Sequence, residues 1–120
     1  MSEPTGDTLS DAQFHQRASA VLTSIEADTD RWLQQDVIDI DTHRTGGLLE
    51  LSFPNGSKIV VNLQPPLHEI WVAARQGGFH FRHANGQWVD TRDGSTGLYA
   101  VLDREASAQA GRPLSFSVAA

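Results

Sequence analysis

Carboxylates are concentrated in one stretch of this sequence, and carboxylate oxygens are the ligands that hard cations prefer in proteins. Six of the fifteen acidic residues fall between positions 26 and 41, where Arg31 is the one basic residue. They are Glu26, Asp28, Asp30, Asp36, Asp39 and Asp41. Such a cluster predicts a weak metal site or a docking surface for a basic partner.

The spacing of these carboxylates places some of them on shared faces. Glu26 and Asp30 are four residues apart, so on a helix their side chains are neighbours. Asp39 and Asp41 alternate with isoleucines, so on a strand they share one face. Like charges this close repel one another unless a cation or a basic partner neutralises them. The spacing therefore predicts an exposed acidic ridge that follows a helix end and a first strand.

His15 is a candidate for an outlying metal ligand, because on a helix it lies on roughly the same side as Glu26. No EF-hand loop, HExxH motif or Glu-x-x-His pair strengthens the metal interpretation. The alternative is a solvated acidic face that aids solubility, and the charge pattern alone favours this alternative.

Two helices are predicted, one near each end of the chain. Residues 10–13 have the form of a capping box, and apolar residues at helical spacing follow as far as Trp32. This pattern predicts a helix over about residues 11–32. Apolar residues return to helical spacing from Leu98 to Ala106, and Gly111 with Pro113 supplies a stop signal.

The sequence between the two helices alternates between apolar and polar residues, which predicts about six strands. The first of these is expected to include residues 38–41, and tight turns are expected at residues 55–56, 77–78 and 85–86. Helices and strands do not alternate along the chain, so we expect no parallel crossover units. The expected fold class is α+β: a two-layer sandwich in which two helices pack on one face of a mainly antiparallel sheet.

The opposite face of this sheet is expected to be open to solvent or to partners. Asn62, Gln64 and Trp71 are assigned to that face by the alternation of the central strands. A tryptophan exposed among polar residues is typical of an interface anchor. The alternative is an indole that folds back over the sheet beneath the prolines at 65–66, and the residues alone favour neither.

Length and composition limit the classes of protein that need to be considered. A chain of 120 residues predicts a single domain over 1–120, with 1–9 as a flexible lead-in. The absence of cysteine excludes disulfides, thiolate metal sites and cysteine nucleophiles. The formal net charge of -6 disfavours nucleic acid as a partner. No apolar run is long enough to span a membrane and no signal peptide is recognisable, so we expect a cytoplasmic protein.

The middle of the chain closely resembles the signature of the bacterial frataxins, the CyaY family. The resemblance is carried by residues 55–62, Gln64, residues 66–68, 70–71 and 76–81, Trp88 and residues 93–94. Residues 14–15 and 25–26 also match the first helix of that family. The resemblance covers roughly residues 11–111, and it implies the same helix–sheet–helix sandwich that the element order predicts.

The resemblance also implies a function in iron–sulfur cluster assembly. It implies a monomeric, non-enzymatic protein that binds iron, as Fe²⁺ or Fe³⁺, weakly through the acidic ridge. The same ridge would bind the cysteine desulfurase, and Asn62, Gln64 and Trp71 would face assembly partners such as the scaffold protein. Two alternatives are a ferroxidase that stores iron, for which the sequence supplies no buried di-iron motif, and an interaction module that is independent of iron.

The ridge departs from the family pattern at several positions. Ala27, Arg31, Leu33 and Gln35 occupy places that are commonly acidic in bacterial frataxins. Glu26, Asp30 and Asp39 align with the family ridge, whereas the other three carboxylates are extra or displaced. The remaining ridge is therefore expected to suit the docking of a basic partner better than the storage of many iron ions.

Overall fold

The first helix begins at a capping box, as its sequence predicts. The computed structural model describes residues 8–119, and α1 runs from Asp11 to Gln34. Ser10 Oγ accepts a hydrogen bond from the Gln13 amide, and the Gln13 side chain accepts one from the Ser10 amide, at 3.1 and 2.9 Å. Of the expected lead-in, residues 1–7 lie outside the described residues, and Leu9 packs against the core.

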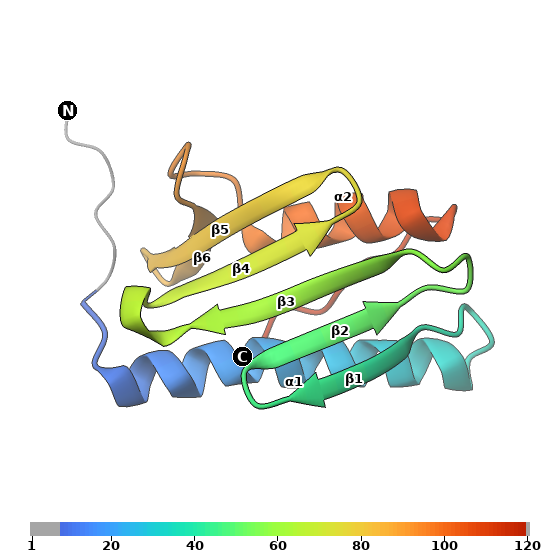
Figure 1. The fold of residues 1–120 in the computed structure, drawn as a ribbon, viewed down its shortest axis with the longest axis horizontal. Helices are drawn as coiled ribbons and strands as arrows, with labels where there is room; N and C mark the ends of the chain where they lie inside the picture. The colour runs from blue at the N-terminus through green and yellow to red at the C-terminus, as the bar shows by residue number, and fades with distance from the viewer. Residues whose placement is uncertain (1–7, 120) are drawn as a thin grey trace.

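The sheet has six strands, and each strand is antiparallel to its neighbour in sequence. The spatial order is the order along the chain, so the sheet is a simple meander, as predicted (Figure 1). Its elements are β1 (Asp41–Thr45), β2 (Leu48–Ser52), β3 (Lys58–Gln64), the 3₁₀ turn η1 (Pro65–Leu67), β4 (Glu69–Ala74), β5 (Gly77–Ala84) and β6 (Gln87–Asp90).

The expected start of the first strand is wrong by a few residues. The sequence predicts a strand over residues 38–41, but β1 begins at Asp41, so Asp39 precedes the sheet. The reason is the length of the partner strand. Asp41 pairs with Ser52, the last residue of β2, and the chain then turns at Phe53, whose carbonyl accepts from the Gly56 amide at 2.9 Å. No β2 residue is left to pair with residues 38–40, although Ile40 remains buried.

Both helices cover the same face of the sheet (Figure 1). α2 (Leu98–Ala110) ends at Gly111, which adopts a left-handed φ of 71° that favours glycine. Alternate residues of the central strands point toward the helices and form the core with them. These core residues include Leu49, Leu51, Ile59, Val61, Ile70 and Val72. The two-layer sandwich predicted from the sequence is confirmed, and no helix of residues 8–119 covers the other face of the sheet.

The segment after α2 is an extended strap, residues 114–119, that ties the two helices together. Leu114 and Phe116 are buried, as a packed tail requires. The Phe116 amide donates to Asp103 of α2 at 2.8 Å. The Ser117 amide donates to Asp28 of α1 at 2.7 Å. The described helices include none that is long and apolar enough to cross a membrane.

Candidate functional site

Four aspartates form an exposed acidic edge where α1 ends and β1 begins. We use the term acidic edge for Asp30, Asp36, Asp39 and Asp41. Asp36 lies just beyond the helix with a left-handed φ of 60°, and the chain then runs through Asp39 into β1 at the margin of the sheet (Figure 1). Within residues 8–119 these four side chains make no ion pair. Their charges are therefore available to a cation or to a basic surface.

Glu26 belongs to the predicted ridge, but its charge is largely compensated. Its Oε1 atom accepts a hydrogen bond from Nη1 of Arg44 on β1 at 2.7 Å. The same guanidinium nitrogen lies 3.1 Å from the Thr23 hydroxyl. Both members of the ion pair are half-buried, so Glu26 fastens α1 to β1.

Asp28 does not lie on the ridge at all. It is 1% exposed, although its place in the acidic stretch predicts a metal ligand. One carboxylate oxygen accepts from Arg31 at 2.9 Å and the other accepts from the Ser117 amide at 2.7 Å. Its position on the helix turns it toward the strap, because residues 25, 28 and 32 share the buried side of α1. Asp28 therefore has a structural role.

His15 lies far from the acidic edge. It is exposed and precedes Glu26 by eleven residues on one continuous helix. A rise of 1.5 Å per residue separates the two by roughly 16 Å along the axis. Among the described residues, no group of three or more His, Cys, Asp or Glu side chains is arranged to hold a metal ion. The predicted ligands thus form an open surface with no cage.

The three polar and aromatic residues predicted on the uncovered side of the sheet do share that side. Asn62 pairs with Trp71, and Gln64 pairs with Glu69, in the register of β3 and β4. Facing residues in an antiparallel pair point to the same side. We call this surface, with Asn62, Gln64, Glu69, Trp71 and His80, the sheet face. A hollow of about 190 Å³ lies beside Trp71 and is also lined by Asn62 and His80.

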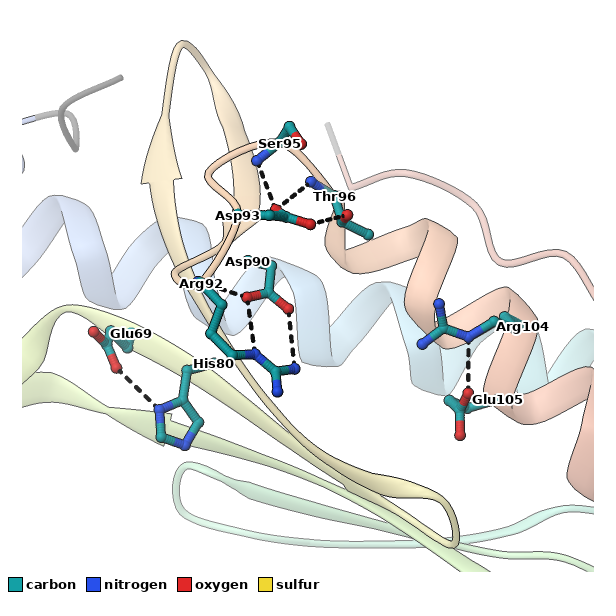
Figure 2. Close-up of polar contacts among 9 residues, drawn as sticks. All are labelled: Glu69, His80, Asp90, Arg92, Asp93, Ser95, Thr96, Arg104 and Glu105. Atoms are coloured by element: carbon teal, nitrogen blue, oxygen red, sulfur yellow. Dashed lines mark hydrogen bonds and ion pairs between the residues drawn. The ribbon is translucent and has the colours of Figure 1, made fainter. Parts of the chain in front are cut away.

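Trp71 is held on the sheet face by two neighbours. Its indole ring stacks on the His80 imidazole of β5, with ring centroids 4.1 Å apart and planes inclined by 5°. The indole Nε1 donates to Oε1 of Glu69 at 2.8 Å. The same Glu69 oxygen lies 3.9 Å from His80 Nδ1 (Figure 2). The three side chains therefore form one unit on adjacent strands.

Basic residues at the opposite edge of the molecule are already paired. Arg92 lies against the buried carboxylate of Asp90, and Arg104 donates to the buried Glu105 at 2.9 Å (Figure 2). Both guanidinium carbons also lie 5.5 Å from the centre of the Phe79 ring. The guanidinium groups of Arg92 and Arg104 therefore add little unpaired positive charge to this edge.

Two carboxylates outside the acidic edge have pKa values that hydrogen bonds lower. The Asp93 carboxylate accepts hydrogen bonds from the Thr96 hydroxyl and from the Ser95 and Thr96 amides, which lower its pKa to about 2 (Figure 2). The hydrogen bond and charge of Lys58, 2.6 Å away, lower the pKa of Glu50. Both groups stabilise turns or strand pairs and lie apart from the candidate surfaces.

Sequence reasoning missed three residues that shape these surfaces. Arg44 lies outside the acidic stretch, eighteen residues after the Glu26 that it neutralises. Glu69 and His80 were not assigned to the partner surface. Glu69 and Trp71 are two residues apart on one strand, so the alternation that placed Trp71 on the uncovered side also predicts Glu69 there. The contact with His80 depends on the register of β4 and β5, which pairs Trp71 with His80.

The fold and these surfaces define a small α+β sandwich protein whose candidate sites are an acidic edge and an uncovered sheet face. The model of the frataxin-like domain matches residues 7–112 of the chain. The chain belongs to the frataxin family, in its bacterial CyaY branch. The family resemblance noted in the sequence is thereby confirmed.

Curated relatives match nearly the whole chain. The iron–sulfur cluster assembly protein CyaY of Variovorax paradoxus is 48% identical over 111 residues, which cover 92% of this chain and 100% of the relative. The protein of the same name from Paraburkholderia phymatum is 50% identical over 106 residues, which cover 88% of this chain and 96% of the relative.

Solved frataxin structures share the fold. The frataxin of Psychromonas ingrahamii is 30% identical with a TM-score of 0.77, and the match covers 91% of this chain and 99% of that one. A trimeric frataxin from the yeast Saccharomyces cerevisiae, complexed with ferrous iron, is 24% identical with a TM-score of 0.64. That match covers 91% of this chain and 93% of the yeast chain, and it supports the fold alone.

Proposed function

We propose that this protein is a non-enzymatic adaptor of iron–sulfur cluster assembly that docks on the cysteine desulfurase through its acidic edge. The names of its bacterial relatives support a role in this assembly. The observation that carries the docking proposal is the set of four exposed aspartates that form no ion pair with any other residue that the structure describes. Complementary charge steers a basic partner to such a surface and fixes its orientation.

The sheet face is the proposed contact for the scaffold protein or for the desulfurase–scaffold complex. Trp71 is half-buried and flanked by the amides Asn62 and Gln64. A rigid aromatic side chain beside a hollow suits a central interface contact, and the amides supply hydrogen bonds around it. β1–β3 lie between the acidic edge and the sheet face in one sheet, and the proposal is that one assembly contacts both.

Iron is proposed as a weakly bound cargo of the acidic edge. Aspartate oxygens are suitable ligands for hard cations, and the exposed aspartates leave room for water to complete the coordination. The lack of a three-residue metal cluster in residues 8–119 argues for loose binding with little selectivity between Fe²⁺ and other divalent ions. Asp28 and Glu26 are left out of the proposed set, because their oxygens are engaged.

The proposed working unit is a monomer in the cytoplasm. The net charge of -6 supports the monomeric state, since the acidic edges of two copies would repel each other. The yeast relative described above is a trimer, so the monomer needs a direct test. Light scattering with and without ferrous iron would give a single monomeric mass if the proposal is right.

The docking proposal is tested with a pair of variants that change net charge equally. Asp30→Asn/Asp39→Asn removes two negative charges from the acidic edge. Ala100→Lys/Ala108→Lys adds two positive charges at exposed positions of α2, so both variants change the net charge by the same amount. We expect the first variant to bind the purified desulfurase roughly tenfold more weakly at low salt, and the difference to shrink at high salt. The α2 variant should change affinity much less. Equal effects of both variants would mean that net charge, and not the acidic edge, controls docking.

A further inference from the structure

A cleft of about 670 Å³ lies between the two helices and the β5–β6 turn, apart from the acidic edge and the sheet face. Its walls come from one side of α1 near Arg17, from the β5–β6 turn, from the start of α2 and from the end of the strap (Figure 1). At a rise of 1.5 Å per residue, Arg17 lies roughly 20 Å along the α1 axis from Asp30 of the acidic edge. The cleft is therefore a separate candidate site.

The inner walls of the cleft are apolar and already packed. Val21 and Leu98 are core residues that line it, and Trp88 adds a large ring that is 8% exposed. The Trp88 ring packs edge-on against Phe14 and His83, with ring centroids 5.9 and 5.0 Å apart. Walls held in this way need little ordering when a ligand binds. The volume lies within the range of roughly 300–1,000 Å³ that is typical of small-molecule sites.

The charge at the cleft is opposite in sign to the charge of the whole chain. The net charge is -6, yet no aspartate or glutamate lines the cleft, whereas Arg17 does. The residues three and four positions away from Arg17 on α1, at 13–14 and 20–21, carry no charge either. Arg17 is exposed and makes no ion pair with any residue of 8–119. Its guanidinium is therefore available to an anionic group.

Tyr99 supplies a second hydrogen-bond donor at the cleft. Its hydroxyl oxygen accepts from the Ala119 amide at 3.0 Å, and within residues 8–119 no group accepts the hydroxyl proton. Burial, together with the charge of Asp28, raises the pKa of Tyr99, so the hydroxyl keeps its proton at neutral pH. The amides of Gln16 and Gln87 also line the cleft and add neutral donors. Donors thus outnumber acidic groups around an apolar interior.

We propose that this cleft binds a small organic anion, whose apolar body packs against Trp88 and the strap and whose single anionic group meets Arg17 and Tyr99. Val118 of the strap lines the cleft and is 72% exposed, so an apolar ligand body would remove it from water. A metal cation is disfavoured, because the lining residues include no carboxylate. The inference does not rest on the proposed docking function.

Two probes that differ only in charge test the proposal on the whole chain. The anionic probe is 1-anilinonaphthalene-8-sulfonate, which carries one sulfonate on aromatic rings. The neutral probe, N-phenyl-1-naphthylamine, has the same rings without the sulfonate. Fluorescence titration of the wild type should give one site for the anionic probe, with a dissociation constant on the order of 10–100 µM for a ligand of this size. A wild type that does not bind the anionic probe overturns the inference.

The anionic group is tested by removing its proposed partners. Arg17→Gln should weaken the anionic probe about three- to tenfold and leave the neutral probe unchanged. Arg75→Gln removes another exposed arginine, after β4 and outside the cleft, and should affect neither probe. Tyr99→Phe should weaken the anionic probe alone, and an unchanged neutral probe shows that the cleft is still formed. Equal weakening by both arginine variants would mean that the probe responds to net charge, and the inference falls.

The apolar interior is tested by filling it. Ala20 of α1 lines the cleft and is half-buried, so Ala20→Phe should abolish the binding of both probes. Ala27→Phe adds the same ring at an exposed position of α1 outside the cleft and should leave both affinities unchanged. Thermal melting checks that each variant folds. Wild-type binding of the probes by a folded Ala20→Phe variant overturns the inference.

The place and the kind of occupant are tested separately. Amide chemical shifts measured by nuclear magnetic resonance should change most at residues 86–87 and 97–100 when the anionic probe is added. Changes centred on Asn62 and Trp71 would place the probe on the sheet face and overturn the inference. Competitive release of the probe by the purified desulfurase would mean that a segment of a protein partner occupies the cleft, and the proposed small anion would be wrong.

Discussion

The carboxylate of Glu26 is 2.7 Å from the guanidinium of Arg44, and this ion pair joins the first helix to the first strand. A residue that the sequence places in a metal-binding ridge is thus neutralised by a cation eighteen positions later. The pair is partly exposed, so it adds about 0–1 kcal/mol to stability. Its larger effect is on the local field, because it removes one negative charge from the surface beside the acidic edge.

Removing the arginine should therefore strengthen cation binding. We expect Arg44→Gln to free Glu26 and to raise the affinity for Mn²⁺, used as a probe of the acidic edge, roughly three- to tenfold. Mn²⁺ titration followed by electron paramagnetic resonance measures this change. Arg17→Gln, which removes an arginine near the start of α1, is the matched control and should leave affinity almost unchanged. Equal gains in both variants would show that total charge, and not the release of Glu26, is responsible.

The turn after β6 should weaken in acid. Hydrogen bonds from Thr96 and Ser95 lower the pKa of Asp93 to about 2, below its usual value of 3.8. A folded-state pKa that is lowered means that the charged form stabilises the fold at higher pH, and this contribution is lost as pH falls from 3.8 toward 2. Melting temperatures measured across this range should fall less steeply for Asp93→Asn than for the wild type. Asp39→Asn, whose side chain has no such partners, should keep the wild-type slope.

Gln109 should be important for stability although it is polar. Its buried side chain donates to the Ser57 hydroxyl and the Lys58 carbonyl, each at 3.1 Å, and accepts from the Arg75 amide at 3.0 Å. Gln109→Ala removes all three hydrogen bonds, although the Ser57 hydroxyl keeps Asn55 Oδ1 as an acceptor at 2.7 Å, so we expect a loss of about 2 kcal/mol in the free energy of unfolding in urea. Gln34→Ala, exposed in the last turn of α1, should cost far less. Equal losses of unfolding free energy in the two variants would mean that the hydrogen bonds of the Gln109 side chain do not stabilise the fold.

The strap should contribute to stability through its aromatic anchor. Phe116 is 5% exposed and packs edge-on against Trp32 of α1, with ring centroids 5.0 Å apart. Phe116→Ala should lower the free energy of unfolding by about 3–4 kcal/mol, because the cavity between the helices cannot collapse fully. Ser115→Ala, at an exposed neighbouring position, is the control. A loss below about 1 kcal/mol would mean that the strap packs only loosely.

Local signals predicted most of the fold. The capping box at Ser10, the helical spacing of α1 and the alternation of the strands all depend on near neighbours in sequence, so they could be interpreted without knowledge of the fold. Asn85-Gly86 adopts positive φ at both residues, as a tight hairpin turn requires. At Asn55-Gly56 only the glycine does so, because residues 53–57 separate β2 from β3 and the connection is longer than a two-residue turn. The Asn55 side chain donates to the Gln109 carbonyl at 2.7 Å. That distant contact was not visible in the sequence.

The candidate site was predictable to a smaller extent, because its surfaces depend on contacts between residues that lie far apart in the sequence. Alternation alone placed Asn62, Gln64 and Trp71 on one side of the sheet. The charge count could not distinguish exposed Asp30 from buried Asp28, because the two are separated by half a helical turn and by the strap that covers one of them.

The contact between Asp28 and the Ser117 amide spans 89 positions of the chain, so the order of synthesis matters for the last step of folding. During translation, α1 and the whole meander leave the ribosome before the strap does. Until residues 114–119 emerge, the Asp28 carboxylate lacks its amide partner and Trp32 lacks the ring of Phe116. A nascent chain can therefore form its sheet early while one side of its helix layer stays open, and the helices can be locked together only after translation has passed the strap.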